Sequence, residues 1–299
     1  MGRPSTTGTA RADLHLHSTY SDGVHSPRHL IELAAAAGLS AVSITDHDAV
    51  DGIEEAQAAG QALGVEVIPG VELSTNERGI ELHVLGYFID PKCEQLKEYL
   101  RFFQEERLKR VQKIVDLLKA VGCPVSFEGV MRYSPHGSVG RPHIAQAMVD
   151  CGFVSSPGEA FARYLSEDRP AFVPKYKILA SEAIALINAA GGLAFVAHPG
   201  NNVPDDLILA LIKQGLQGIE TVHPRHSASE TYRYRSLAAR YGVLETGGSD
   251  FHGFPHEAAL GTYVVSYSAV RRMRQLVPAS QGNGESPVTQ RSEGESRID

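Results

Sequence analysis

The chain of 299 residues has no tryptophan, only three cysteines and no apolar run close to the roughly 20 residues of a membrane-spanning helix. Its first residues also lack the apolar stretch of a secretory signal. Cys93, Cys123 and Cys151 are widely spaced and form no Cys-x-x-Cys motif, which argues against a disulfide framework and a zinc knuckle. These absences predict a cytoplasmic protein with reduced thiols and no membrane partner.

The chain also has fewer basic than acidic residues. Lys and Arg together number 28 against 35 for Asp and Glu, which gives a formal net charge of −7. Proteins that bind long nucleic-acid duplexes usually present a basic face, so we do not expect such a partner. A nucleotide or a short RNA is compatible with this balance. The 42% of hydrophobic residues suffices for a substantial core, and the composition leaves the oligomeric state open.

Hydrophobic periodicity divides the chain into parts. Residues 1–10 and 277–299 are rich in Gly, Ser, Pro and charge, and we expect both ends to be mobile. Short apolar segments alternate with helical patterns over residues 11–92 and 181–276, which predicts an α/β fold with a largely parallel sheet closed into a barrel. Residues 93–180 instead show a long amphipathic helix and shorter ones, and we expect them to form an inserted helical cap domain.

Residues that bind metal ions recur where the predicted strands end. His15 and His17 are separated by one residue, so a strand would point both side chains to one face, where they can bind one ion. Functional residues of a barrel gather at its strand ends, so the other candidates are expected nearby. The complete set is His15, His17, Asp22, His47, Glu72, His83, His198, Asp250 and His252.

This set combines imidazole with carboxylate and contains no cysteine. Such ligands are typical of Mn²⁺, Fe²⁺ or Zn²⁺ at a hydrolytic site rather than of a structural zinc site. Nine ligands exceed what one ion can use, so we expect two or three divalent ions, with Mn²⁺ favoured. Clustered ions activate bound water and neutralise phosphoryl charge, which favours phosphate-ester hydrolysis.

The inserted segment contains candidates for binding a phosphate. Arg141 and His143 belong to a Gly-Arg-Pro-His sequence that opens a helix, where free backbone N–H groups favour an anion. Ser134 lies on the adjoining loop. Lys175 and Lys177 follow the last helix of the insertion, and of these two Lys175 is taken as a substrate contact. Each residue alone is also compatible with a solvated surface position.

A further basic loop follows the strand predicted over residues 218–222. His223, Arg225 and His226 are candidates for binding phosphate or for protonating the leaving oxygen, with the identity of the acid left open. His223 is counted among the catalytic candidates. A plain turn made by Pro224 and a helix cap at Ser227 would explain those two residues but not the three basic ones.

Five ordered motifs resemble those of the polymerase-and-histidinol-phosphatase (PHP) superfamily of metal-dependent phosphoesterases. They are His15-Leu16-His17, Thr45-Asp46-His47, Gly70-Val71-Glu72, Ala197-His198-Pro199 and Ser249-Asp250-Phe251-His252, spread over residues 11–265. The resemblance implies a distorted (β/α)7 barrel that holds up to three ions. The first ion would be held by His15, His17, Glu72 and Asp250. Glu72 would bridge to a second ion held by His83 and His198, and the third would be held by Asp22, His47 and His252.

Within the superfamily the chain resembles one branch in particular. It has Ser21-Asp22-Gly23 where some members have a histidine, and the sequences Glu81–Gly86 and Gly140–His143 also match. Members of this branch remove the 3′-phosphate of nucleoside 3′,5′-bisphosphates, and some trim short RNA from the 5′ end.

The resemblance thus implies a phosphoric monoester hydrolase whose metal-bridging hydroxide attacks the 3′-phosphorus, with His15, His17, Glu72 and Asp250 at the reacting centre. Asp13 and Asp46 would orient the ligand histidines. The alternatives are a 5′-3′ exoribonuclease, a phosphatase for histidinol phosphate or another small monoester, and a module of the same fold without catalytic activity.

Overall fold

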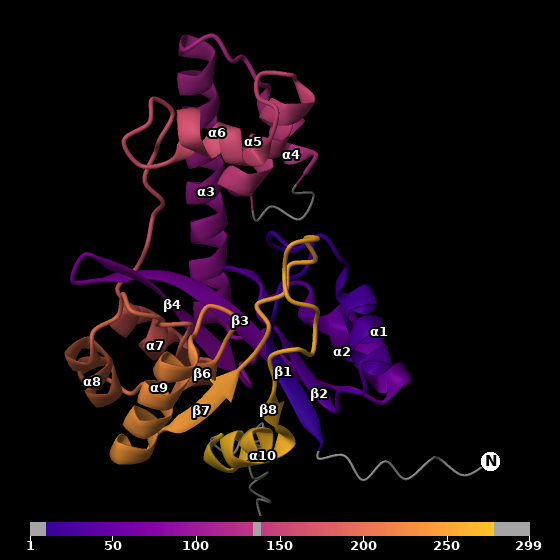
Figure 1. Cartoon of the computed structure of the whole chain (residues 1–299), viewed down its shortest axis with the longest axis vertical. Helices are drawn as coiled ribbons and strands as arrows, with labels where there is room; N and C mark the ends of the chain where they lie inside the picture. Colours follow the sequence, from indigo (N-terminus) through magenta and orange to yellow (C-terminus); the bar gives the residue numbers. More distant parts are fainter. Residues whose placement is uncertain (1–9, 134–138, 278–299) are drawn as a thin grey trace, which may run out of the picture.

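The computed structural model describes residues 10–133 and 139–277, and within these ranges it contains one sheet of eight strands. Ser134 and nearly all of the two ends expected to be mobile lie outside the described residues. The strands are β1 (Arg11–Leu16), β2 (Ala41–Ile44), β3 (Glu66–Glu77), β4 (Ile80–Tyr87), β5 (Leu193–Val196), β6 (Gly218–Val222), β7 (Leu244–Gly247) and β8 (Val265–Ser266). The sheet curls into a nearly closed barrel with helices outside it, which confirms the predicted fold class (Figure 1).

The sheet is less parallel than the sequence pattern predicted. Its order is β7-β6-β5-β4-β3-β2-β1-β8, with parallel pairing within β1–β3 and within β5–β7. β4 is antiparallel to both of its neighbours, and β8 is antiparallel to β1. Only Arg78 and Gly79 separate β3 from β4, and both have positive φ angles (52° and 79°), as a tight hairpin turn requires. A parallel connection needs a dozen or more residues, so this spacing dictates an antiparallel pair.

The barrel closes where the segment after β7 runs beside β1. The backbone N–H of Ser249 donates to Oδ1 of Asp13 (2.9 Å), and the N–H of His17 donates to the carbonyl of Phe251 (3.0 Å). Gly248 lies against His15 so closely that an added Cβ would stand 2.4 Å from both the Cβ and the N of that residue. Closure therefore depends on a glycine at the point where the two segments meet.

Replacing Gly248 by alanine is expected to force β1 away from β7 and to lower the free energy of unfolding by about 3 kcal/mol, the upper end for overpacking. Denaturant unfolding in the presence of a chelator measures this effect without a contribution from bound ions. Gly158→Ala is the matched control, because the nearest atom to its new Cβ, Ser156 Oγ, would be 3.9 Å away. Equal stability of the two variants would contradict the closure argument.

Helices cover the outside and one end of the barrel. They are α1 (Pro27–Ala36), α2 (Ile53–Leu63), α7 (Ala180–Ala189), α8 (Asp205–Lys213), α9 (Ala228–Tyr241) and α10 (Tyr267–Leu276). α1 begins as predicted after Ser26, whose Oγ accepts a hydrogen bond from the N–H of His29. α10 was not predicted, because its arginine-rich sequence buries only a narrow apolar stripe. Val270 and Met273 of that stripe pack in one apolar cluster with Leu14 and Phe195, at the end of the barrel away from the insertion (Figure 1).

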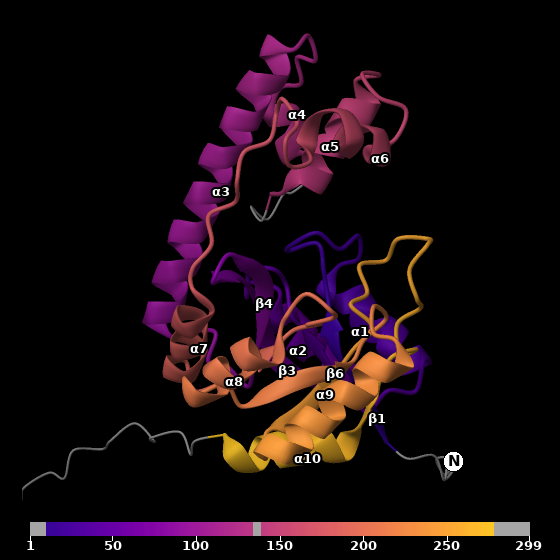
Figure 2. The ribbon, with the colours of Figure 1, turned by 60° about the vertical axis from the view of Figure 1, so that its left-hand side comes forward.

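The inserted segment consists of helices that extend beyond the barrel. They are α3 (Glu94–Ala120), α4 (Phe127–Met131), α5 (Arg141–Asp150), α6 (Pro157–Ala160) and the π-helical segment η1 (Phe161–Leu165). α4 was not predicted, since a helix of five residues is too short to show a period. Figure 2 shows α4–α6 at the far end of α3, over the open end of the barrel, and these helices have an apolar cluster of their own. Within the part of the chain that the structure describes, no helix is long and apolar enough to span a membrane.

Candidate functional site

His15 lies in β1 and His17 directly follows it, and the alternation of the extended chain places both histidines on one face, as predicted. His15 and His17 are fully buried, and their Nε2 atoms lie 3.1 Å apart. Two ring nitrogens can approach so closely only if at least one of them carries no hydrogen. At least one of these two nitrogens therefore presents a lone pair where β1 ends.

Glu72, in the middle of β3, is the centre of the cluster. Its Oε2 lies 3.3 Å from His15 Nε2, 3.2 Å from His17 Nε2 and 3.1 Å from His47 Nδ1. Its Oε1 accepts hydrogen bonds from His83 Nδ1 (2.8 Å) and His198 Nε2 (3.0 Å). One carboxylate thus faces five imidazoles, which is the position expected of a ligand shared between ions.

His83 belongs to this cluster, but its position in its strand differs from the predicted one. It stands near the beginning of β4, not at a strand end, and pairs with Ser74 of β3. Because β4 runs antiparallel to β3, its beginning lies at the same rim as the ends of the parallel strands. The antiparallel hairpin therefore explains why a residue near the start of a strand joins the site.

Asp250 completes the group around His15 and His17. Its Oδ1 lies 3.1 Å from His17 Nε2 and 3.4 Å from His15 Nε2, and its backbone has a left-handed φ of 50°. Its Oδ2 lies 3.2 Å from Nε2 of His223. Nδ1 of His223 accepts a hydrogen bond from the N–H of Arg225, so the neutral ring carries its hydrogen on Nε2 and donates it to Asp250. Burial lowers the pKa of His223 below its usual value, which favours this neutral form.

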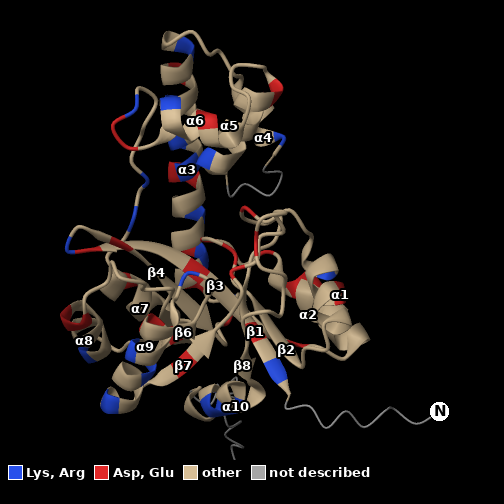
Figure 3. Ribbon diagram, in the orientation of Figure 1, with Lys and Arg blue, Asp and Glu red and all other residues tan. Residues whose placement is uncertain are grey.

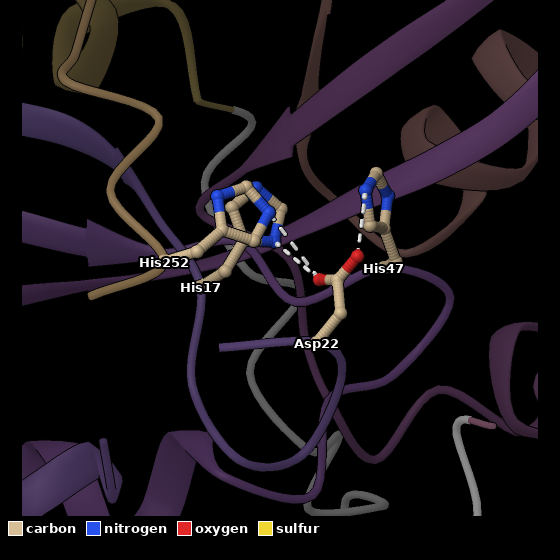
Figure 4. Close-up of side chains that lie close together, drawn as sticks. All are labelled: His17, Asp22, His47 and His252. Atoms are coloured by element: carbon tan, nitrogen blue, oxygen red, sulfur yellow. Dashed lines mark ion pairs between the residues drawn. The ribbon is translucent and has the colours of Figure 1, made fainter. Parts of the chain in front are cut away.

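A further group of donors forms on the other side of His17 (Figure 4). Oδ1 of Asp22 lies 3.4 Å from His252 Nε2 and 3.8 Å from His17 Nδ1, while Oδ2 lies 3.9 Å from His47 Nε2. The rings of His17 and His252 are stacked, with centroids 4.2 Å apart. His17 therefore offers one nitrogen to each of two groups, which the resemblance did not imply.

The spacing of these donors fits metal ions. Around an ion with bonds of about 2.1 Å, neighbouring donor atoms are about 3.0–3.4 Å apart. The measured separations among the first-group donors of His15, His17, Glu72 and Asp250 are 3.1–3.4 Å. Nδ1 of His17, Oδ1 of Asp22 and Oε2 of Glu72 are buried and have no hydrogen-bond partner among the described residues. Buried polar atoms without hydrogen bonds are costly, and bound cations would satisfy them.

The carboxylates of the cluster are held in the form that binds cations. Burial alone raises the pKa of Glu72, but the imidazoles of His47, His83 and His15 outweigh it and hold the pKa well below the usual range. The same competition, between burial and the imidazoles of His15 and His17, holds the pKa of Asp250 well below its usual value. Both groups are therefore ionised at neutral pH, as metal ligands must be.

Among the residues that the structure describes, four overlapping groups of three or four donor residues could each hold an ion, with the donor atoms of each group within 4.8 Å of one another. The groups draw on all nine residues that the sequence suggested, together with His223. The structure thus contains His/Asp/Glu clusters able to bind several metal ions.

Asp13 and Asp46 accept hydrogen bonds from loop residues and not from the rings of the ligand histidines. Their expected role is corrected accordingly. Asp13 accepts hydrogen bonds from the N–H groups of Ser249 and Gly261 (2.9 Å each) and so holds the loop that carries Asp250. Asp46 accepts from the N–H and hydroxyl of Ser18 and from the hydroxyl of Ser21, next to Asp22. The contact to a ligand ring comes instead from Glu220, which the sequence reasoning missed.

A cleft of about 360 Å³ joins the His/Asp/Glu cluster to the insertion. His47, His83 and Asp22 line its barrel side. Lys and Arg residues recur along α3 and along the segment that returns from the insertion to α7 (Figure 3). The basic residues that line the cleft are Arg107 and Arg110 of α3, Arg141 of α5, and Lys175 and Lys177 of the returning segment. With only Asp22, Glu81 and Glu167 as acids, the lining carries an excess of positive charge.

Arg107 and Arg110 were not predicted, although the sequence contains a signal for them. Both are buried within α3, on the same stripe as Leu100, Phe103 and Ile114. An arginine on the apolar stripe of an amphipathic helix needs a polar partner from another element. Arg107 finds one in Asp48, 2.7 Å from its guanidinium, and a second in the carbonyl of Val139.

The predicted contacts for substrate differ in where the structure places them. Arg141 lines the cleft between the rings of Phe161 and Phe172, and Lys175 lies 3.4 Å from Asp48. His143 uses Nδ1 to accept a hydrogen bond from the N–H of Gly140, so it caps α5.

On the basic loop after β6, Arg225 is largely exposed, 3.8 Å from Asp250. His226 is buried, its Nδ1 donating to the carbonyl of Thr221 and its Nε2 accepting from the N–H of Gly200. Since both ring nitrogens bind backbone groups, the expectation that His226 contacts substrate is corrected to a structural role.

Comparison with known proteins gives the class of this protein. The sequence profile of the PHP domain matches residues 13–146. A crystal structure from Bifidobacterium adolescentis, assigned as a metal-dependent phosphoesterase, superposes with a TM-score of 0.82 and 32% identity, covering 88% of this chain and 94% of that one. The chain belongs to the PHP family of metal-dependent phosphoesterases.

Two curated relatives are more specific in name. The 3′,5′-nucleoside bisphosphate phosphatase of Chromobacterium violaceum is 34% identical over 249 residues, which are 81% of this chain and 87% of that protein. The 5′-3′ exoribonuclease of Haemophilus influenzae is 36% identical over 252 residues, 83% of this chain and 91% of that protein.

Proposed function

We propose that this phosphoesterase removes the 3′-phosphate of nucleoside 3′,5′-bisphosphates and leaves the nucleoside 5′-monophosphate. The observation that carries the proposal is the continuous cleft between the His/Asp/Glu cluster and the basic wall of the insertion. A substrate with two phosphates needs two anion sites at a fixed distance. The bisphosphate phosphatase of C. violaceum, which matches over most of both chains, supports the same choice.

The reacting phosphate would lie at the cluster. Bound divalent ions, with Mn²⁺ favoured, would activate water and neutralise charge on the phosphoryl group. His15, His17, Glu72 and Asp250 would hold the first ion. Glu72, His83 and His198 would hold the second, and Asp22, His47 and His252 the third, with His17 contributing its other nitrogen. Arg225, exposed beside Asp250, is placed to contact phosphoryl oxygens from the solvent side.

The retained 5′-phosphate would bind at the insertion. Arg141 is held by the carbonyl of Leu165 and by two aromatic rings, which leaves other guanidinium N–H groups for an anion. Lys175 and Arg107 line the same cleft, 5.3 Å and 5.1 Å from the centroid of the Phe103 ring, and both pair with Asp48. Guanidinium and ammonium groups held in this way form a suitable binding site for a phosphate dianion.

Binding through Lys175 should weaken at alkaline pH. Burial, with a smaller effect from Arg107, lowers the pKa of Lys175 to about 8, so the ammonium is charged below that pH and neutral above it. We expect the KM for the bisphosphate to rise up to about 10-fold from about pH 7 to about pH 9, the value of one charge-assisted hydrogen bond. Lys175→Arg, which stays charged over this range, should show a KM that does not change with pH. An equal rise of KM in both proteins would show that Lys175 does not bind the 5′-phosphate.

A second candidate function is 5′-3′ exoribonuclease activity on short RNA. A hollow of about 560 Å³ adjoins the cleft at Glu81 and His83, and its lining includes His198, Asn201, Asn202 and Arg225. It offers room for the rest of an oligonucleotide whose 5′ end is bound at the insertion. The exoribonuclease of H. influenzae supports this alternative.

Phosphate release by the Mn²⁺-loaded protein tests the proposal. The substrates are adenosine 3′,5′-bisphosphate, 3′-AMP, 5′-AMP, histidinol phosphate and a short 5′-phosphorylated RNA. Fast turnover of the bisphosphate that stops at 5′-AMP is the expected result. Preference for histidinol phosphate would contradict the bisphosphate assignment, and release of mononucleotides from RNA alone would make the exoribonuclease the main activity.

A further inference from the structure

Glu220 is a fully buried carboxylate on β6 that contacts two of the proposed metal ligands. Its Oε1 lies 2.9 Å from Nδ1 of His15, and its Oε2 accepts a hydrogen bond from the backbone N–H of His198 at 2.7 Å. We propose that Glu220 is a positioning residue. It would orient His15 as a ligand of the first ion and His198 as a ligand of the second. The inference rests on the metal site of the proposed function, but not on the identity of the substrate.

The contact to His15 determines which ring nitrogen is free. An ionised carboxylate can only accept hydrogen bonds, so Nδ1 of His15 must carry the hydrogen. In the neutral ring the lone pair is then on Nε2, which is the atom that faces Glu72 and Asp250. A carboxylate behind a histidine in this way fixes both the tautomer and the orientation of a metal ligand.

The contact to His198 acts on the backbone instead. His198 follows β5 with a φ of 24°, which residues with a side chain rarely adopt. Such a conformation persists only where surrounding contacts hold it. The bond from its N–H to Glu220 is one such contact, and it leaves the His198 ring with Nε2 at 3.0 Å from Glu72. Glu220 therefore stabilises an unfavourable backbone state that directs a ligand at the site.

Both contacts need acceptors, which is why a carboxylate suits this position and an amide does not. A glutamine would offer one carbonyl oxygen and one NH₂ group. If the NH₂ faced His198, two donors would oppose each other. If it faced His15, the hydrogen of that ring would move to Nε2 and block metal binding. Glu220→Gln thus keeps the shape of the side chain while removing one of the two contacts.

The test is a titration of the metal-free protein with Co²⁺, followed by visible absorption, which reports both affinity and coordination geometry. In Glu220→Gln, the binding steps that use His15 and His198 should weaken about 10- to 100-fold, the usual effect of losing such a partner. The step that uses Asp22, His47 and His252 should keep its affinity, because the contacts of Glu220 are to His15 and His198. Glu245→Gln is the control, since Glu245 lies on the adjacent β7 and binds Thr221 and Arg235 instead of a ligand.

Glu220→Asp is the second variant, because it keeps the charge but is too short to reach both donors, and a smaller loss of affinity is expected. Unchanged Co²⁺ affinity and spectrum in folded Glu220→Gln would overturn the proposal. Loss of the fold in both variants would also overturn it, by making Glu220 a general stabilising residue. As no substrate enters this titration, its outcome is independent of whether the bisphosphate is turned over.

Discussion

Replacing Glu72 by glutamine is expected to reduce phosphate release at least about 1,000-fold, equivalent to about 4 kcal/mol. Glu72 is the residue whose two carboxylate oxygens face all five surrounding imidazoles. The amide would remove the negative charge that two ions would share in the proposed site, and it would leave a single acceptor oxygen. Metal content after dialysis, measured with kcat for the bisphosphate, should fall together with activity.

Glu77→Gln serves as the control for this variant. Glu77 lies at the end of the same strand and accepts a hydrogen bond from the N–H of Ala180, at a contact that an amide oxygen can still make. It should retain wild-type activity and metal content. Full activity of Glu72→Gln with undiminished metal would show that the cluster is not the reacting centre.

Removing the guanidinium of Arg141 is expected to affect substrates selectively. Arg141→Ala should lower kcat/KM for adenosine 3′,5′-bisphosphate by about 10- to 100-fold, the range for losing hydrogen bonds to a charged group. The same variant should act on 3′-AMP almost as well as the wild type does, because that substrate has no 5′-phosphate to bind. The quantity to measure is the ratio of kcat/KM values for the two substrates.

Arg163→Ala is the matched control in the same inserted segment. Arg163 is half exposed, pairs with Glu159 and does not line the cleft. It should leave both substrates unaffected. Equal losses on the two substrates in Arg141→Ala would indicate that Arg141 supports the fold of the insertion through Phe161 and Phe172 rather than binding the 5′-phosphate.

The ligand-type residues could be found from the sequence because each lies close to an element that shows its own pattern. His15 lies in β1 and His17 directly follows that strand, while His47, His198 and Asp250 follow short apolar runs. Local periodicity is enough to place such residues at one edge of a sheet. It does not give the separations between residues far apart in the chain, and these decide whether the edge can hold an ion.

Other residues of the site give only a faint local signal. Glu220 is one acid in a five-residue strand, and its partners His15 and His198 are 205 and 22 residues away. Arg107 is one charge among many on a long helix, and its partner Asp48 lies 59 residues earlier. Conversely, His226 has the composition of a substrate contact but binds the backbone of Thr221 and Gly200. In each case the partner became evident only in the folded chain.

The sequence by itself determined the class of fold, the helical character of the segment between β4 and α7 and the residue types of the His/Asp/Glu cluster, because these depend on spacing along the chain. Tertiary structure alone decided that β4 runs antiparallel and brings His83 to the rim, that Glu72 stands between five imidazoles, and that the basic residues of α3 face the same cleft as His47. These features depend on distances between segments separated by tens to hundreds of residues. Such distances are fixed by the closure of the barrel and the packing of the insertion, which no local pattern records.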